Sequence, residues 1–463
     1  MGGLSMKSMS LREIAAVCGG HYYGDESKLN IEVTGVAIDS RKIEAGYLFV
    51  PIKGARVDGH DFIPQVMEKG ALCTLSEHAL ENASYPYILV SSSEQALKDL
   101  AEHYRKALGI KVVGITGSVG KTSTKEMIAS VLSQKYNVLK TAGNFNNEIG
   151  LPLTIFNIRE EHEVAVLEMG ISDFGEMHRL AKMARPDICV ITNIGLCHLE
   201  NLIDRDGILK AKTEMFDYRQ PDAKIILNGD DDKLITVKDS GDKSPIYFGL
   251  STELDAFADD IHSLSLKGTS CTLHLGDNSV DVLIPIPGHH MVYNALAGAL
   301  VGRELGLTNK EIKAGIESLV PVSGRNNMIS TDSLLIIDDC YNANPVSMKA
   351  SIDVLATADS RTVAILGDMF ELGENEANMH REVGIHASEK EIDVLVCIGP
   401  LANHIAEGAS ESKKKTAVYH FDTKADFLAY ADLIVQKGDS ILVKASHGME
   451  FPEIVEKLQQ MRF

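Results

Sequence analysis

Apolar and polar residues follow two different spacings along most of this chain. Short runs of consecutive apolar residues recur, as at residues 111–116, 164–169 and 224–228. Between these runs, apolar residues return every three or four positions, which is the period of an amphipathic helix. After the first run, the residues that share one helical face are Met127, Ile128, Val131 and Leu132. Wholly apolar strands that alternate with such helices predict a parallel sheet wound on both sides.

Changes in this pattern divide the chain into three blocks, and each block predicts an α/β domain. Residues 1–92 mix short strands, at 47–52 and 87–90, with short helical patterns and loops dense in Gly and Asp. Residues 93–325 contain the alternation described above, and residues 326–463 repeat it. We therefore expect a smaller N-terminal α/β domain, a central parallel-sheet domain and a C-terminal doubly wound, Rossmann-like domain.

Composition predicts a soluble, globular and cytoplasmic protein, and we expect a monomer, although no sequence feature determines the oligomeric state. The 463 residues are 44% hydrophobic, but no apolar run is long enough for a signal peptide or a membrane span. The seven cysteines are scattered without a CxxC pair, as expected for reduced thiols. The net charge of -20 argues against nucleic acid as a partner. It does not exclude an anionic ligand, because backbone N–H groups and one lysine can hold a phosphate.

The segment GITGSVGKTSTK, at residues 114–125, has the character of a phosphate-binding loop, or P-loop. It departs from the usual Walker spacing, which would place a glycine where Ile115 stands. An apolar strand nevertheless leads into the turn and a helical pattern follows, so backbone N–H groups and a helix N-terminus point at one place. Lys121 would then reach the phosphates of a nucleoside triphosphate, and Thr122 would bind Mg²⁺. The loop residues assigned to the nucleotide are Gly117, Ser118, Val119, Gly120, Lys121, Thr122 and Ser123.

Three further residues, two after predicted strands and one on a predicted helix, have weaker local signals. Glu168 ends an apolar run and could be a second Mg²⁺ ligand, although a surface acid at a strand end fits equally well. His198, in TNIGLCHLENL, could bind metal or position a phosphate, but a lone loop histidine is more often an ordinary polar residue. Lys212 lies on a predicted helix, where a solvated charge is the commoner case.

Asparagine and aspartate gather in two more loops. The segment TAGNFNNEIGLPLT offers Asn144 and Asn147, whose amides can hold a carboxylate or phosphate without adding charge; a structural turn is the competing interpretation. In IIDDCYNANPVSM, Asp338 and Asp339 could bind a ribose diol or an ammonium group, and Asn344 follows shortly after. Capping of the next helix is the alternative there.

Taken together, these segments resemble the Mur ligases, the ATP-dependent, amide-forming ligases of bacterial cell-wall precursor synthesis. The family pattern lies in TGSVGKTS, the strand that ends at Glu168, TNIG with His198, AKTE at residues 211–214 and GHHMVYNALA at residues 288–297. The segments DSR and DGHDF in the first block, and YNANPVSM and LGDMFELGE in the third, are similar to one subgroup. The resemblance covers nearly the whole chain in the same order.

The resemblance implies a catalytic and metal-binding set. Lys121 and Thr122 would hold the ATP phosphates and the first Mg²⁺, with Glu168 as a further ligand. His198 would serve a second metal ion. Lys212 would carry a carbamate, which makes it an anion able to bind metal. The implied catalytic residues are Lys121, His198 and Lys212.

The resemblance also implies contacts with the nucleotide and the other substrates. Asn294 would lie beside the adenine, and Arg325 and Asp339 near the phosphates and ribose, with the choice between Asp338 and Asp339 left open. The implied substrate-binding residues are Ser40, Arg41, Asp58, Gly59, His60, Asn144, Asn147 and Asn344.

The activity implied by the subgroup is the joining of D-alanyl-D-alanine to UDP-N-acetylmuramoyl-tripeptide through an acyl phosphate, with ATP and Mg²⁺. The first domain would hold the UDP-sugar end, the second ATP and the third D-alanyl-D-alanine, in a hinged protein that closes over its ligands. Two alternatives remain open. One is another amide ligase of the superfamily, such as a different Mur ligase or a folylpolyglutamate synthase, and the other is a non-catalytic nucleotide-binding module.

Three positions depart from the family pattern. Met291 stands where an asparagine often follows the GxH histidine. Ala445 and His447 stand where glycine and arginine are more usual, which weakens any role for His447 in contacts with phosphate or carboxylate.

Overall fold

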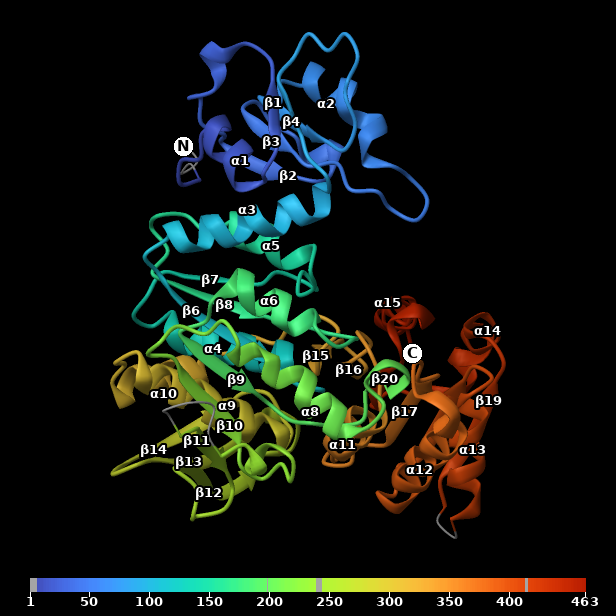
Figure 1. Cartoon of the computed structure of the whole chain (residues 1–463). Helices are drawn as coiled ribbons and strands as arrows, with labels where there is room; N and C mark the ends of the chain where they lie inside the picture. The colour runs from blue at the N-terminus through green and yellow to red at the C-terminus, as the bar shows by residue number, and fades with distance from the viewer. Residues whose placement is uncertain (1–5, 198, 239–243, 413–414) are drawn as a thin grey trace.

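The computed structural model describes residues 6–197, 199–238, 244–412 and 415–463, and its strands form three separate sheets (Figure 1). The sheets follow one another along the chain, and each is combined with helices. The three α/β units predicted from the apolar pattern are therefore present. The boundaries after residues 92 and 325 stay predictions.

The N-terminal sheet has five short strands. Their order is β1 (His21–Tyr23), β5 (Tyr87–Leu89), β4 (Cys73–Ser76), β3 (Tyr47–Phe49) and β2 (Gly35–Ala37). Strand β1 runs antiparallel to β5, and the other neighbours are parallel. The helices of this unit are α1 (Leu11–Val17), α2 (Ile63–Glu68) and the 3-10 helices η1 (Glu26–Lys28), η2 (Ser40–Lys42) and η3 (Gly59–Phe62).

The central sheet has nine strands. Their order is β14 (Asn278–Ile284), β13 (Thr269–Leu275), β12 (Ala256–Ser263), β11 (Ile246–Gly249), β10 (Lys224–Asn228), β9 (Ile188–Ile191), β6 (Lys111–Thr116), β8 (Val164–Glu168) and β7 (Val138–Lys140). The α-helices of this unit are α3 (Ser93–Ala107), α4 (Lys121–Leu132), α5 (Gly150–Phe156), α6 (Glu176–Ala184), α7 (Leu199–Leu202), α8 (Arg205–Thr213), α9 (His290–Glu304) and α10 (Asn309–Glu317). Strands from β7 to β12 are parallel, so their carboxyl ends share one edge of the sheet.

One end of the central sheet differs from the parallel prediction. Strands β13 and β14 form an antiparallel hairpin that continues from β12. In β13, buried and partly exposed residues alternate, so one face of the strand is buried. Helices α9 and α10 pack against the hairpin, and they cover its apolar face. Such a half-buried hairpin needs no crossover helix.

The C-terminal sheet has six strands, and all but one pair are parallel. Their order is β15 (Asn327–Ser330), β16 (Leu335–Asp338), β20 (Ser440–Lys444), β17 (Thr362–Gly367), β18 (Val394–Ile398) and β19 (Ala417–Phe421). The α-helices are α11 (Pro345–Leu355), α12 (Glu376–Glu389), α13 (Ala402–Glu411), α14 (Lys424–Ile434) and α15 (Pro452–Gln460). Every parallel strand is followed by a helix, as the sequence predicts.

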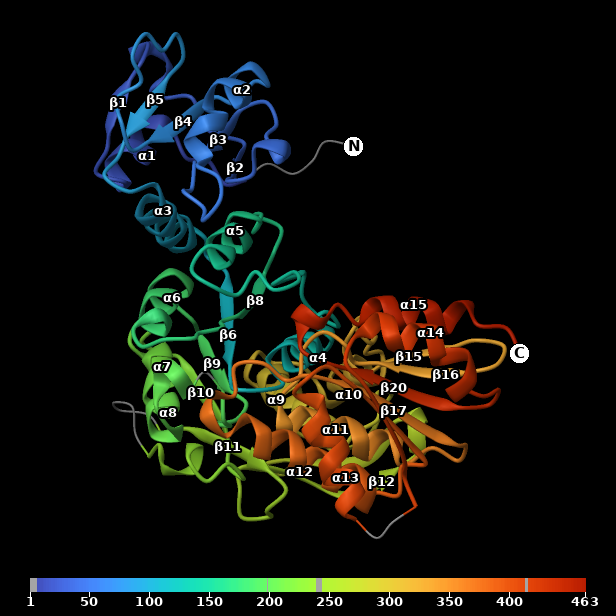
Figure 2. The same ribbon diagram turned by 90° about the vertical axis from the view of Figure 1, so that its right-hand side faces the viewer.

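The cores of the three units are not equally separate. Leu48 of the N-terminal sheet, Leu100 and Tyr104 of α3, and Leu180 of α6 belong to one continuous buried cluster. The C-terminal sheet instead has its own apolar cluster on each face. Figures 1 and 2 show the N-terminal unit at one end, next to α3 and α5, and the C-terminal unit beside the central one. Within the described residues, no helix is long and apolar enough to cross a membrane.

Candidate active site

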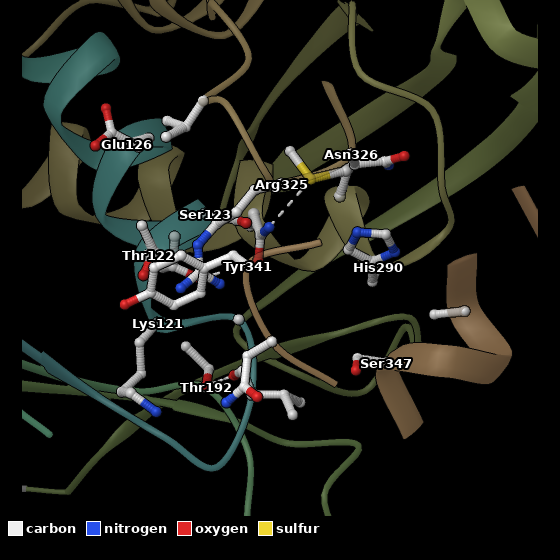
Figure 3. Close-up of a pocket in the computed structure, with 18 of the residues that line it drawn as sticks. Lys121, Thr122, Ser123, Glu126, Thr192, His290, Arg325, Asn326, Tyr341 and Ser347 are labelled. Carbon is white, nitrogen blue, oxygen red and sulfur yellow. Dashed lines mark hydrogen bonds between the residues drawn. The ribbon is translucent and has the colours of Figure 1, made fainter. Parts of the chain in front are cut away.

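A cavity of about 520 Å³ lies between the central and C-terminal units, and residues of both line it. From the central unit come the residues that follow β6, β7 and β9, the last residue of β8 and the start of α9. From the C-terminal unit come the loop after β16, the first turns of α11 and the end of β20. Figure 3 shows Lys121, Thr122 and Ser123 on one side of this cavity and Ser347 on another. Ligands of parallel sheets bind beyond the carboxyl ends of the strands, and this cavity has that position.

The predicted phosphate-binding loop joins β6 directly to α4. Gly117 has φ +154, and a Cβ atom there would lie 1.9 Å from Oγ1 of Thr192. Gly120 precedes α4 with φ +80, in the left-handed region. Glycine is therefore required at two places in the turn. Ile115 is still within β6 and fully buried, which explains why this loop needs no glycine at the usual Walker position.

The loop after β9 holds the phosphate-binding loop in shape. Val119 donates its N–H to Oδ1 of Asn193 at 3.0 Å, and Oγ1 of Thr192 donates to the carbonyl of Val119 at 2.7 Å. The N–H of Ser118 is bonded to the carbonyl of Asn193 at 3.1 Å, and its hydroxyl interacts with the backbone of Gly195. Thr192 and Asn193 were not among the residues that the sequence predicted for the site. Their position directly after a buried strand was the available signal.

Lys121 is folded back over the loop. Its Nζ donates to the carbonyl of Gly117 at 2.9 Å and lies 3.5 Å from the carbonyl of Ser118. Burial lowers the pKa of this lysine, while the nearby carboxylate of Glu168 acts in the opposite direction. The ammonium group therefore stands inside the turn where the loop would enclose a phosphate.

Thr122 and Glu168 meet at the carboxyl end of β8, as the sequence predicts for a shared cation. The Thr122 hydroxyl donates to Oε2 of Glu168 at 3.0 Å, and Nδ2 of Asn146 donates to Oε1 at 2.9 Å. Lys125 Nζ lies 3.8 Å from the same carboxylate. Hydroxyl and carboxylate oxygens are the ligands that Mg²⁺ prefers, so this pair fits a magnesium ion that keeps several waters. No cluster of three or more His, Cys, Asp or Glu suited to a metal occurs among the described residues.

Lys212 is buried on α8, contrary to the common case of a solvated helix charge. Its exposed fraction is 2%, and no hydrogen bond or ion pair to its amine occurs within the described residues. Burial, with a smaller contribution from the charge of Lys121, lowers the pKa of Lys212 to about 7. Lys212 does not line the cavity itself. His198, the other predicted metal ligand of this region, lies outside the described residues.

The residues of the central unit that are predicted to contact the nucleotide, Asn294 and Arg325, line the same cavity. Asn294 is buried on α9, where its Oδ1 accepts from the Thr124 hydroxyl at 2.9 Å. Its amide nitrogen is 3.2 Å from Sδ of Met291, so the methionine that departs from the family pattern contacts this asparagine. Arg325 lies in the linker before β15, with its guanidinium carbon 4.0 Å from the centre of the Tyr341 ring. Figure 3 shows this ring against the arginine.

The two aspartates after β16 occupy different positions. Asp338 is buried and accepts the N–H of Gly324 at 2.8 Å and the thiol of Cys340 at 2.9 Å, and it does not line the cavity. Asp339 does line it. Of the two, only Asp339 is therefore placed to face a ligand in the cavity.

The predicted asparagines of the two polar loops line the cavity, and two of them also accept hydrogen bonds from backbone N–H groups. Oδ1 of Asn147 accepts the N–H of Gly150 at 2.8 Å at the start of α5. Asn344 caps α11 by accepting the N–H of Ser347 at 2.8 Å. The turn and capping interpretations therefore describe these two side chains, and their substrate contacts stay predictions. Asn144 also lines the cavity.

The predicted residues of the first block lie in the N-terminal unit and do not line this cavity. Arg41 is exposed and forms a two-bond ion pair with Asp39, next to Ser40 in η2. Asp58 precedes η3 and accepts from both the backbone and the ring of His60. The other ring nitrogen of His60 accepts the N–H of Glu77 at 3.1 Å, so its imidazole is fully used within the unit.

The last residue of this predicted set is Gly59. It contacts the backbone of Ile52 so closely that a Cβ would lie 2.7 Å from its nitrogen. A substrate role of these first-block residues stays a prediction.

Fold and site together define a P-loop enzyme in which a second α/β unit completes the nucleotide cavity. The chain matches the Mur ligase middle domain over residues 115–302 and the glutamate ligase domain of Mur ligases over residues 324–447. The catalytic domain of the Mur ligase family matches over residues 32–105. This chain belongs to the Mur ligase family.

Individual relatives give a more detailed comparison. The chain is 41% identical to UDP-N-acetylmuramoyl-tripeptide–D-alanyl-D-alanine ligase of Bacillus subtilis, over 92% of this chain and 93% of that protein. The crystal structure of MurF from Acinetobacter baumannii superposes with a TM-score of 0.92 at 30% identity, over 99% of this chain and all of that one. MurF of Thermotoga maritima, solved in complex with ADP, gives a TM-score of 0.82 at 31% identity, over 92% of this chain and 97% of that one.

Proposed function

We propose that this protein joins D-alanyl-D-alanine to UDP-N-acetylmuramoyl-tripeptide and uses ATP to do so. The observation that carries the proposal is the cavity, in which a phosphate-binding loop faces a second α/β unit. The names of the relatives supply the substrates, and the ADP complex of the Thermotoga relative supports ATP as the nucleotide.

The chemistry of this reaction explains why two units must meet at the cavity. A carboxylate is a poor electrophile, so the stem peptide must first attack the γ-phosphate of ATP to form an acyl phosphate and ADP. The amine of D-alanyl-D-alanine then attacks the acyl carbon, and inorganic phosphate leaves. The first step brings two anions together, so the site must cancel negative charge and exclude water that would hydrolyse the acyl phosphate.

Lys121 and the loop amides are the groups of this chain that would cancel charge. The N–H groups of Ser118 and Val119 are bonded to Asn193, so the amides that would face the phosphates are those of Gly120 and the first turn of α4, whose N-terminus favours an anion. Thr122 and Glu168 would hold Mg²⁺, which supplies further charge neutralisation when bound. Carbamylation of Lys212, with His198, would provide a site for a second ion.

Asn294, Arg325 and Asp339, which also line the cavity, would contact the nucleotide. The N-terminal unit would hold the UDP-sugar end of UDP-N-acetylmuramoyl-tripeptide through η2 and η3. Residues Asn144, Asn147 and Asn344 would contact the reacting ends of the two substrates. The C-terminal unit would bring D-alanyl-D-alanine.

A panel of amines, tested with one carboxylate substrate, distinguishes this function from that of other amide ligases. UDP-N-acetylmuramoyl-tripeptide and ATP would be incubated with D-alanyl-D-alanine, D-glutamate, L-alanine or L-lysine, and the product identified by mass spectrometry. We expect an adduct with D-alanyl-D-alanine alone. An adduct with another amine only, or glutamate addition to a folate in a parallel reaction, would replace the proposal with a different ligase of the superfamily.

A further inference from the structure

Lys444, the last residue of β20, is a buried cation that the proposed reaction does not use directly. Its side chain is 4% exposed. Nζ lies 2.6 Å from Oδ2 of Asp339, 3.0 Å from the carbonyl of Asn342 and 3.4 Å from the carbonyl of Asp339. An ammonium group has three N–H donors, and these three acceptors account for all of them. Although Lys444 lines the cavity, it has no donor left for a phosphate.

The carboxylate of Asp339 connects Lys444 to two other segments. Its Oδ1 accepts the backbone N–H of Asn326 at 3.0 Å, and its Oδ2 also accepts the Ser351 hydroxyl at 2.5 Å. Asn326 belongs to the linker between the central and C-terminal units, and Ser351 to α11. One buried ion pair therefore ties together the end of β20, the loop after β16, the linker and α11.

Two cavity residues, Arg325 and Tyr341, lie next to the backbone groups that this junction holds. Arg325 directly precedes Asn326, whose N–H is held by Asp339. Tyr341 lies between the two backbone carbonyls that Lys444 contacts, and its N–H is bonded to the carbonyl of Gly324 at 3.0 Å. The Arg325 guanidinium stacks on the Tyr341 ring, 4.0 Å from its centre (Figure 3).

We propose that Lys444 is a positioning residue for nucleotide binding. Its ammonium group holds Asp339 and the loop of Tyr341, and thereby sets the Arg325–Tyr341 pair at the cavity. The inference rests on the proposed function in one respect, that this cavity binds ATP. A change of about 1 Å in a binding group is enough to lower its contribution substantially, so loss of the junction should appear in nucleotide affinity.

The test compares Lys444→Met, Asp339→Asn and the double variant. Calorimetry with a non-hydrolysable ATP analogue and Mg²⁺ gives Kd, and steady-state assays give KM for ATP and for UDP-N-acetylmuramoyl-tripeptide. We expect Lys444→Met to raise Kd and KM for ATP about tenfold or more, with KM for the UDP substrate nearly unchanged. The Kd of the double variant should be no higher than the higher Kd of the two single variants, because both substitutions break the same junction.

Lys457→Met is the matched control. Lys457 is in the same unit and pairs with Asp432 at 3.1 Å, but this pair is at the surface, so its loss should leave Kd unchanged. If Lys444→Met does not fold, Ser351→Ala carries the test, since it removes one hydrogen bond to the same carboxylate and Ser351 is not among the proposed nucleotide contacts.

Three results would overturn the inference. If Lys444→Met folds and has the wild-type Kd, Lys444 contributes to the stability of the fold and not to nucleotide binding. Effects of the two single variants that add in the double variant would mean that they act independently. Unchanged Kd in both Ser351→Ala and Asp339→Asn would dismiss the junction. Wild-type protein that does not bind the analogue would instead contradict the proposed function, so the two failures are distinguishable.

Discussion

Lys212 is the residue whose surroundings depart furthest from what its sequence context predicts. A lysine on an amphipathic helix usually points into water, but this one is buried and its pKa is lowered to about 7. Burial disfavours the ammonium form, since an unpaired charge loses its hydration. The neutral amine is the form that reacts with CO₂. The structure therefore supports the carbamylation that the family resemblance implies.

We predict that Lys212 forms a carbamate near neutral pH. With a pKa of about 7, the neutral fraction of the amine rises as the pH increases from about 6 to 8, whereas an ordinary lysine stays charged in this range. At constant dissolved ¹³CO₂, the carbamate signal in ¹³C NMR should grow over that interval. It should be absent from Lys212→Arg and present in Lys210→Arg, whose side chain is exposed on the same helix. Absence of the signal from wild type throughout would contradict the prediction.

At the scale of elements, the phosphate-binding loop depends on close contact between the ends of β6 and β9. Gly117→Ala should abolish binding of an ATP analogue, because the new Cβ would lie 1.9 Å from Thr192 Oγ1 and the residue has φ +154. Gly438→Ala is the control for backbone strain, since Gly438 has φ +94 but a Cβ added there would have no atom within 4 Å. That control should cost about 1 kcal/mol of stability and leave affinity intact. Equal affinities in calorimetry for wild type and Gly117→Ala would refute the described loop geometry.

The elements that the sequence predicted well are those with strong local signals. Strand β6 and the start of α4 at Lys121 follow from an apolar run, two glycines and a helical period. The runs of consecutive apolar residues do not predict the β13–β14 hairpin, because its residues alternate between buried and more exposed positions on either side of Gly276. That alternation is itself a strand signal.

The candidate site was predicted in part. Thr122, Glu168, Asn294 and Asp339 line one cavity, as the resemblance implies for residues far apart in the chain. Thr192, Asn193 and Lys444 were not found. Thr192 and Asn193 have a weak signal, their position directly after a buried strand, whereas the importance of Lys444 depends on contacts with the loop after β16, which no local pattern in the sequence records.

At the scale of the whole molecule, the arrangement of the cores supports a prediction about which unit would move. The N-terminal and central units share a buried cluster, whereas the C-terminal unit has its own clusters and follows a linker in which Gly324 and Asn326 have positive φ. A cavity lined from both sides would then close by movement of the C-terminal unit. Each unit can retain its core during such a movement.

We predict that substrates make the molecule more compact. The radius of gyration from small-angle X-ray scattering should fall when UDP-N-acetylmuramoyl-tripeptide and a non-hydrolysable ATP analogue are added together. Either ligand alone should produce a smaller change, because each contacts only part of the cavity. Equal radii with and without both ligands would contradict closure.

The most direct test of the central claim is phosphate release from ATP and Mg²⁺ with UDP-N-acetylmuramoyl-tripeptide, measured with and without D-alanyl-D-alanine. We predict that wild type releases phosphate only when both substrates are present, and that Lys121→Ala reduces the rate by about 10²-fold or more while remaining folded. Steady release without the dipeptide would mean either that water hydrolyses the acyl phosphate or that D-alanyl-D-alanine is not the amine substrate. No phosphate release with any combination of carboxylate substrate and amine would contradict a ligase and favour a non-catalytic nucleotide-binding protein.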